Sequence, residues 1–402
     1  MEEATFRSFV ALWLKGILDE AAGDGDGDGD GSLLPPSFAQ ALLAADPCVD
    51  QEPDCLADEL ELVRSCCQVD LDKACIEGVP AYPLYTQLAA NLCRSLEDSK
   101  TPVLDNASEL EEGEDQRDRK REVHARVKQH LAPLAEAFHG VRFRLHVQDR
   151  FLSQLRDGSK IVEGRCATGF YSRIRPGDYL LFNGVLVMET KDVRAYESFQ
   201  NMLETEGLEN VLPGIESVEE GIGIYRGFYS RETEALGVLA LHVSQPIQPR
   251  NAVTALLQSL KVEGVASLLG LRATKGTLVS ALPPPRSRLL ASFLARNSES
   301  VPSSKLTVGG RALAKHVNRS SAGWWGACSG TETAKNKIAL KAVCRIIDQA
   351  SWMNIHHLPQ STHIFEIRVQ DGYGARWSSD GKQFRGFVEP PMKDGHSSKW
   401  RH

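Results

Sequence analysis

Several features that would assign a protein class are missing from this sequence of 402 residues. No window holds the roughly 18 uncharged apolar residues that a membrane helix needs, so we expect no membrane partner. The first residues, MEEATFRSFVALWLKGILDE, place two glutamates before the apolar run and offer no small-residue cleavage site, unlike a secretory signal. Nine cysteines, an odd number without secretory targeting, favour reduced thiols and a cytoplasmic or nuclear location.

Metal-binding patterns are missing as well. Six cysteines lie within 48–93, but they lack the paired CxxC spacing of zinc sites. The GDGDGDGDG run at 23–31 lacks the glutamate that closes a calcium loop, and it is more simply a flexible acidic linker. His356, His357 and His363 lie close together in the sequence without an HxxxH spacing. We therefore predict neither a metal nor a cofactor.

Charge is distributed unevenly along the chain. The net charge is −18 over residues 1–125, −2 over 126–245 and +13 over 246–402. Such asymmetry indicates an acidic N-terminal region and a basic half that binds a partner. Nucleic acid is favoured, because phosphate contacts dominate its binding. The same charge pattern would result if the basic surface were only solvated, or if it bound the acidic region of the same chain.

The N-terminal third is predicted to be an acidic helical region, residues 1–96. Amphipathic patterns predict helices at 4–20, 38–46, 56–67 and 83–96. Their apolar faces could bind a protein partner or form a core of their own. Residues 97–122 are charged and poor in large apolar side chains, which predicts a disordered linker.

Residues 123–245 combine one helix with a series of short apolar strands. The helix is predicted over 123–138, and the strands over 141–148, 160–163, 179–182, 185–188 and 237–243. Asn183 and Gly184 form the dipeptide typical of a two-residue hairpin turn. Lys160, Glu163 and Arg165 are charged residues beside apolar strands. Holding charged side chains there costs free energy, which suggests that they have a function. An exposed ion-pair network on a barrel rim is the alternative.

Four sequence blocks carry a resemblance to a known family. GSKIVEGR, IRPGDYLLFNG, KDVRAYESFQNMLETEGLENVLPG and IYRGFYSRETEALGVLALHV occur in this order within residues 146–245. They resemble the ASCH domain, the activating signal cointegrator homology family. The resemblance implies a PUA-like mixed β-barrel and a link to RNA. We expect the barrel to enclose Val162, Leu180, Phe182, Leu186, Leu239 and Leu241.

The resemblance also suggests catalytic residues. One small bacterial ASCH member deacetylates an acetylated cytidine, and another has been assigned ribonuclease activity. The amidohydrolase motif has a lysine, a threonine three places later, an arginine two places after that and a glutamate in a later helical segment. Lys160 and Arg165 match, Glu163 stands at the threonine, and the later glutamate corresponds to Glu206 or Glu204. Lys160, Glu163 and Glu206 are therefore catalytic candidates, although an anion in place of the hydroxyl argues against deacetylation.

The C-terminal part is predicted to be a helix and Pro-rich connector, 246–300, followed by a small basic α+β domain, 301–402. Arginines alternate with aromatic rings in DGYGARWSSDGKQFRGFVEP. Rings that stack on bases beside cations that bind phosphates suit single-stranded nucleic acid. The same aromatic residues could instead form the core of a β-hairpin. The predicted nucleic-acid contacts along the chain are Arg165, Arg173, Arg194, Arg226, Lys335, Arg376, Trp377, Phe384 and Arg385.

Together these patterns predict an α+β protein that binds RNA through the ASCH-like barrel and the basic C-terminal domain. Two alternatives stay open. The chain could be a hydrolase of RNA or of a modified nucleoside that uses Lys160 and Glu163, or a scaffold whose N-terminal helices bind proteins.

Overall fold

A computed structural model describes residues 5–23, 33–46, 57–67, 78–97, 114–274, 276–297, 303–318, 323–358 and 363–390. The chain divides into two compact units. The first contains Met1–Trp13 and Gln129–Ala255, and the second Leu14–Lys128 and Leu256–His402. Within the described ranges, no helix is both long enough and apolar enough to cross a membrane. Residues 24–31 of the Gly-Asp run lie outside those ranges.

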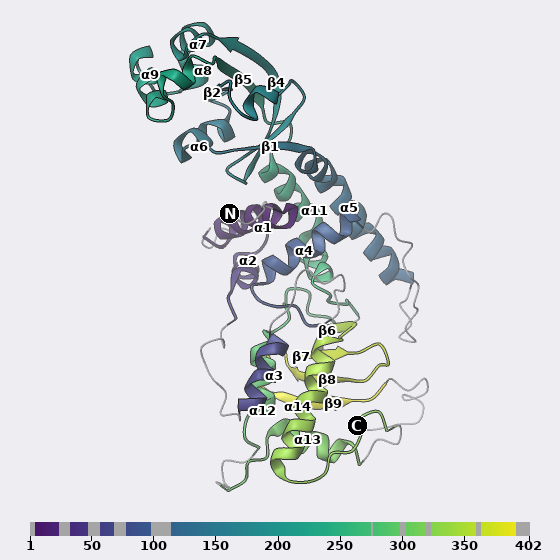
Figure 1. The fold of residues 1–402 in the computed structure, drawn as a ribbon. Coiled ribbons are helices and arrows are strands. Elements are labelled where there is room, and N and C mark those ends of the chain that lie inside the picture. Colours follow the sequence, from purple (N-terminus) through teal and green to yellow (C-terminus); the bar gives the residue numbers. More distant parts are fainter. Residues whose placement is uncertain are drawn as a thin grey trace. The chain divides into compact units, whose positions relative to one another are not determined.

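The first unit is built on a five-stranded mixed sheet in the order β1-β3-β4-β5-β2 (Figure 1). Its strands are β1 (Val141–Leu145), β2 (Val162–Cys166), β3 (Tyr179–Phe182), β4 (Leu186–Tyr196) and β5 (Val238–Ser244). Strand β1 is parallel to β3, whereas the other pairs are antiparallel. Asn183 and Gly184, with φ of 50° and 76°, form the predicted turn between β3 and β4.

Helices and the sheet enclose the core of the first unit. The shorter helices are α6 (Asp149–Asp157), the 3-10 helix η1 (Tyr171–Arg173), α7 (Phe199–Glu206), α8 (Leu208–Val211), α9 (Val218–Arg226) and α10 (Arg231–Glu234). All six residues expected inside the barrel belong to the buried core. The sheet itself is open, because β1 and β2 are its edges and no pairing joins them among the described residues. The α+β prediction is confirmed, whereas no closed barrel is found.

The remaining described helices precede β1 or follow β5 in the sequence. They are α1 (Phe6–Gly23), α2 (Pro36–Leu43), α3 (Ala57–Cys67), α4 (Leu84–Glu97), α5 (Glu114–His139), α11 (Pro249–Leu268), α12 (Arg286–Leu294), α13 (Val308–His316) and α14 (Glu332–Asp348). Side chains of Ser198, Ser217, Ser230, Thr307 and Thr331 each accept a backbone N–H at a helix start. The predicted linker is described only from 114, where its last residues already belong to α5, so they are helical and not disordered.

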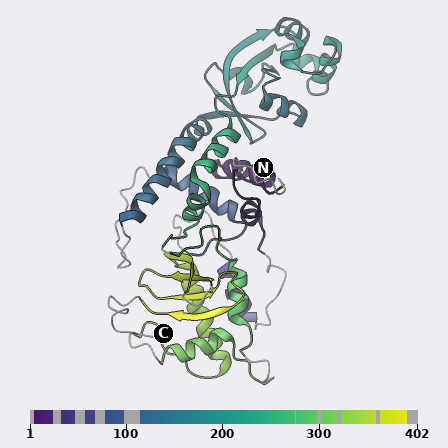
Figure 2. The same ribbon diagram turned by 180° about the vertical axis from the view of Figure 1, so that it is seen from behind.

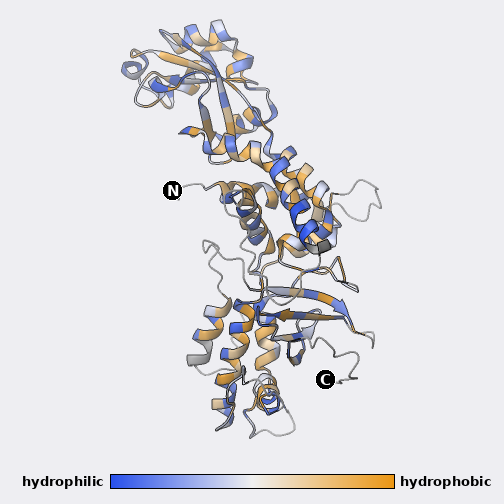
Figure 3. Cartoon of the chain, turned by 90° about the vertical axis from the view of Figure 1, so that its right-hand side faces the viewer, coloured by the Kyte–Doolittle hydropathy of each residue, from blue (hydrophilic) through white to orange (hydrophobic). Residues whose placement is uncertain are grey.

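The C-terminal part of the second unit holds an antiparallel sheet in the order β6-β7-β8-β9. Its strands are β6 (Trp352–His357), β7 (His363–Arg368), β8 (Gly374–Ser378) and β9 (Phe384–Val388). Helices α3, α12, α13 and α14 lie beside this sheet, as the view from behind also shows (Figure 2). Alternate residues such as Met353, Phe365 and Trp377 face a shared apolar core. Apolar residues, orange in Figure 3, recur along these helices and strands.

Segments far apart in the sequence complete this domain. Arg286, which is only 3% exposed, donates to the carbonyls of Val79 (2.6 Å) and Cys66 (2.7 Å) and pairs with Asp348 at 2.6 Å. Strand β6 also receives backbone hydrogen bonds from residues 272 and 278. Helix α3 and the Pro-rich part of the predicted connector therefore pack with the C-terminal domain.

Candidate functional site

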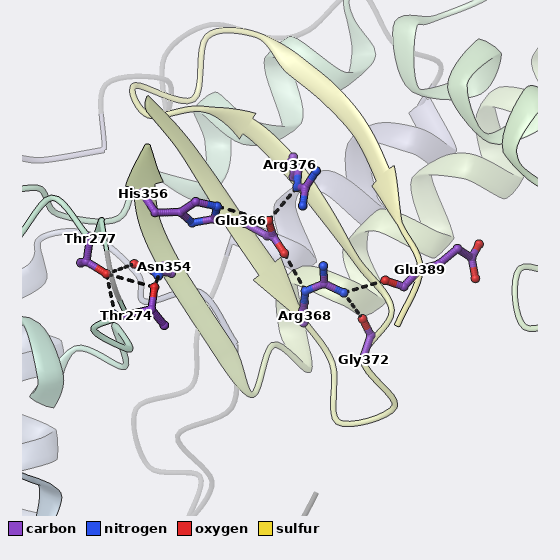
Figure 4. Close-up of polar contacts among 9 residues, drawn as sticks. All are labelled: Thr274, Thr277, Asn354, His356, Glu366, Arg368, Gly372, Arg376 and Glu389. Atoms are coloured by element: carbon purple, nitrogen blue, oxygen red, sulfur yellow. Dashed lines mark hydrogen bonds and ion pairs between the residues drawn. The ribbon is translucent and has the colours of Figure 1, made fainter. Parts of the chain in front are cut away.

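The face of the β6–β9 sheet that points away from the apolar core carries a row of polar side chains. Asn354 on β6, Glu366 on β7 and Arg376 on β8 are cross-strand neighbours, and Gly386 on β9 ends the row. Because side chains alternate along a strand, His356 and Arg368 lie on this same face. Figure 4 shows the cluster, which we call the Glu366 cluster: Asn354, His356, Glu366, Arg368 and Arg376.

Glu366 is the centre of this cluster. It is 3% exposed. Its Oε1 accepts from Arg368 Nε at 2.6 Å and its Oε2 from Arg376 Nε at 2.6 Å. Burial acts to raise the pKa of Glu366, but the two arginines outweigh burial, and the pKa lies below its ordinary value. Glu366 is therefore ionised at neutral pH and orients two guanidinium groups.

The two arginines have different surroundings. Arg368 is 9% exposed, and its Nη1 donates to the carbonyls of Gly372 (2.6 Å) and Glu389 (2.8 Å). Arg376 has a side chain that is 24% exposed and bonds Glu366 only through Nε. Within the described residues, both Nη groups of Arg376 lack a hydrogen-bond partner. Arg368 therefore has a structural role, whereas Arg376 presents the four N–H donors of its two Nη groups, which could bind a phosphate.

His356 adds a titratable group to the cluster. Its Nε2 lies 3.7 Å from Glu366 Oε2, and its buried Nδ1 has no hydrogen-bond partner in the described part of the chain. Burial lowers the pKa of His356, Glu366 opposes this shift, and Arg376 and Arg368 add to it. The imidazole is consequently neutral near pH 7 and can accept a proton.

Asn354 joins the cluster to a segment outside the sheet. The Thr277 hydroxyl donates to Asn354 Oδ1 at 3.0 Å, and Asn354 Nδ2 donates to Thr274 Oγ1 at 2.7 Å (Figure 4). Asn354 is fully buried. These bonds fix the edge of the polar face beside His356. No group of three or more metal-ligating side chains is found in the described ranges.

The aromatic residues predicted to stack on bases belong to the core. Trp377 is fully buried and donates its indole N–H to the Leu289 carbonyl at 3.2 Å. Phe384 is half-buried against the same core. A buried ring offers no surface to a base, so the stacking role predicted for Trp377 is wrong. Arg376 is the predicted contact that joins the cluster, Arg385 is exposed on β9, and Lys335 is half-buried on α14.

The charged residues predicted in the ASCH-like region do come together. Lys160 precedes β2, and its Nζ lies 3.1 Å from Glu163 Oε2 while donating to the carbonyls of Val162 (2.7 Å) and Val211. Burial lowers the pKa of Lys160, and Glu163 opposes that shift. Arg165 pairs with Glu163 at 2.9 Å. Three acceptors match the three donors of an ammonium group, which favours a structural cation over a free base.

Glu206 lies in a separate cluster. It accepts from Tyr196 (2.5 Å) and Arg194 (3.2 Å), and His242 Nε2 lies 3.0 Å away. Among the described contacts, none joins Glu206 to Lys160 or to Glu163. Lys160 and Glu163 are therefore in direct contact, whereas the printed partners of the Glu206 carboxylate are Tyr196, Arg194 and His242.

The other predicted basic contacts of the first unit differ in exposure. Arg173 is exposed, and the side chain of Arg194 is 51% exposed although it pairs with Asp192 at 2.9 Å. Arg226 is paired with Glu234. Arg173 and Arg194 are thus the accessible cations of this group.

Sequence reasoning missed most of the Glu366 cluster. The sequence suggests His356 only as a metal ligand and assigns no role to Asn354, Glu366 or Arg368. A signal was present, because Glu366 and Arg368 alternate with apolar residues in the strand HIFEIRV. Charged residues on one face of an otherwise apolar strand indicate a polar surface on the sheet.

Two family models match this chain. The ASCH domain model matches residues 145–247. A model of the CdiA C-terminal tRNase toxin domain matches residues 295–389, which include all five residues of the Glu366 cluster. No curated protein matches the chain.

Solved structures resemble separate parts of the chain. The hypothetical protein PH0355 is 40% identical over 25% of this chain and 96% of its own, with a TM-score of 0.25. Protein PF0455 from Pyrococcus furiosus is 42% identical over 26% of this chain and 96% of its own, with a TM-score of 0.24. The toxic C-terminal tip of CdiA from Pseudomonas aeruginosa, solved with its immune protein, is 28% identical over 24% of this chain and 100% of its own, with a TM-score of 0.21.

Proposed function

We propose that this chain, which belongs to the ASCH domain family through residues 145–247, binds RNA and cleaves it on the polar face of the β6–β9 sheet. The observation that carries the proposal is the Glu366 cluster, in which Glu366 orients Arg376 toward solvent beside a neutral His356. The match to a tRNase toxin model over the same residues supports RNA as the substrate, with tRNA as the first class to test.

The residues suit cleavage by the RNA's own 2′-hydroxyl. His356 takes the proton from this hydroxyl, the 2′ oxygen attacks the adjacent phosphorus, and the bond from phosphorus to the 5′ oxygen breaks. The leaving oxygen takes a proton from water. The Nη groups of Arg376 stabilise the charge that develops on the phosphoryl oxygens. The product then carries a 2′,3′-cyclic phosphate, and a strand without the 2′-hydroxyl cannot react.

The basic character of residues 246–402, with a net charge of +13, supports binding of a polyanion at this domain. The ASCH domain supplies a second contact region through the exposed Arg173 and Arg194. Neutralising both should weaken RNA binding and flatten its dependence on salt, without changing where the RNA is cut. A change in the cleavage position would place these arginines in the cutting site instead.

The central test compares variants of the full chain on total tRNA. His356→Ala should lower the rate of cleavage by roughly 10²–10⁴-fold, which is the usual contribution of a general base. Arg376→Met should lower kcat by about 10²–10³-fold. Arg385→Met, a matched change on the neighbouring strand, should affect binding alone.

The product and the alternative site are checked in the same assay. We expect a 2′,3′-cyclic phosphate end, and no cleavage of a strand with deoxyribose at the cut position. Cleavage that survives His356→Ala but is lost in Lys160→Met would move the chemistry to the ASCH domain. Cleavage of the deoxyribose strand would exclude the mechanism.

A further inference from the structure

A tryptophan shares the polar face with the Glu366 cluster. Trp352 begins β6, lies opposite Arg368 on β7, and has the same orientation in the strand as His356. Residues four apart on a strand have Cα atoms about 13 Å apart. The rings of Trp352 and His356 nevertheless have centroids only 6.4 Å apart, at an interplanar angle of 66°. The two side chains therefore lean toward each other above Asn354.

Trp352 differs from the other described tryptophans. The indole N–H groups of Trp13, Trp324, Trp325 and Trp377 each donate a hydrogen bond within the chain. That of Trp352 has no partner in the described ranges. Its ring is half-buried and lies outside the apolar core, whereas Trp377 is fully buried. Trp352 is thus a large apolar ring on a polar surface, next to the proposed base.

The surroundings of Arg376 leave space for a nucleotide beside this ring. Gly386 lies opposite Arg376 on β9, and a Cβ atom added there would meet nothing within 4 Å. Gly386, which has no side chain, therefore does not cover the guanidinium. A phosphate bound at Arg376 and a sugar at His356 would direct the attached base toward Trp352.

We propose that Trp352 stacks with the base of the nucleotide whose 2′-hydroxyl is deprotonated by His356, so that the substrate is a single-stranded RNA segment. The inference rests on the proposed cleavage function. A base within a duplex is covered on both faces by its neighbours, whereas a base in a loop or at an end can leave the stack and lie on an aromatic ring. Stacking also requires no particular base, because every base has a π-face.

The test measures binding and cleavage with the full chain. The binding probe is a short single-stranded RNA with one deoxyribose at the cut position, which cannot be cleaved. Trp352→Leu removes the aromatic ring and keeps an apolar side chain, so binding should weaken by about 5-fold to 150-fold. Trp352→Phe should retain most of the affinity. Trp324→Leu is the matched control, because Tyr373 stacks on its ring at 4.4 Å and the Arg345 guanidinium lies 3.9 Å from it.

An abasic probe separates stacking from a structural role. If Trp352 holds a base, removing the base at the cut position should weaken wild-type binding and abolish the difference between wild type and Trp352→Leu. An equal loss on both probes would show that the ring acts on the fold or on His356, and it would overturn the inference. Equal cleavage of duplex and single-stranded targets would also overturn it.

Failure of this inference can be told from failure of the proposed function. If wild type cleaves RNA and Trp352→Leu is indistinguishable from it, only the stacking role is wrong. If wild type neither binds nor cleaves RNA, both proposals are wrong. A Trp352→Leu protein that unfolds is replaced by Trp352→Phe, whose response to the abasic probe decides the question.

Discussion

Replacing Lys160 by methionine tests whether the ion pairs of the ASCH domain are structural. Lys160 is 1% exposed, and its ammonium group satisfies Glu163 and the carbonyls of Val162 and Val211. Methionine fills a similar volume without a charge. The substitution therefore leaves three buried acceptors without their donor, while the packing changes little.

The size of the effect follows from these contacts. Removing one partner of a buried ion pair typically costs about 3–5 kcal/mol. Glu163 keeps Arg165 at 2.9 Å, so its charge stays partly compensated, and we expect the low end of that range. A loss of about 3 kcal/mol corresponds to a roughly 150-fold larger opening equilibrium.

Amide hydrogen exchange read by mass spectrometry on the full chain measures this loss locally. Peptides from β2 and β5 should exchange about 150-fold faster, while peptides from β6–β9 act as the internal control. Lys191→Met is the matched variant, because Lys191 is 53% exposed in its pair with Glu189 and should contribute at most about 1 kcal/mol. A change below fivefold in Lys160→Met would refute the structural interpretation.

The remaining predictions concern the Glu366 cluster and two local structures. Glu366 opposes the lowering of the His356 pKa, and Arg376 enhances it. The acidic limb of kcat/KM should therefore lie below pH 6.5 in the wild type, at lower pH in Glu366→Gln and at higher pH in Arg376→Met. The same acidic limb in all three proteins would exclude His356 as the base. Trp377→Ala should reduce the stability of its domain by about 3–5 kcal/mol in urea unfolding, and native stability would show that the ring is not core. Asn183→Ala should cost about 2 kcal/mol, because the residue has a positive φ and bonds a backbone N–H; an unchanged melting temperature would contradict this.

Local sequence patterns predicted much of the fold. The helices of the N-terminal region, the strand at 179–182 and the Asn183 turn were all found, because propensity and periodicity are local properties. The end of β4 was not predicted. Residues up to Tyr196 are paired with β5, eight positions beyond the predicted strand at 185–188. Pairing with a strand more than forty residues away decided the structure there, and no local pattern contains that information.

Domain boundaries were harder to predict for the same reason. Helix α3 lies in the acidic N-terminal region of the sequence, yet the carbonyl of its Cys66 binds the buried Arg286. Its composition indicates a helix and does not indicate the partner. Likewise, the composition of the Pro-rich segment does not show that its Arg286 donates to the carbonyl of Val79. Such long-range contacts follow from the fold as a whole and are invisible in composition.

Two charge clusters show why the candidate site could not be located from residue types alone. Both contain a buried glutamate bonded to two cations, Lys160 and Arg165 around Glu163 in one cluster and two arginines around Glu366 in the other. The two clusters differ in how many hydrogen-bond donors of their cations have no partner within the protein. All three donors of Lys160 are used inside the protein, whereas Arg376 keeps both Nη groups open to solvent beside a neutral histidine. A buried ion pair becomes a reactive site only when one member still has bonding capacity at the surface, and this depends on exposure and on neighbouring backbone atoms.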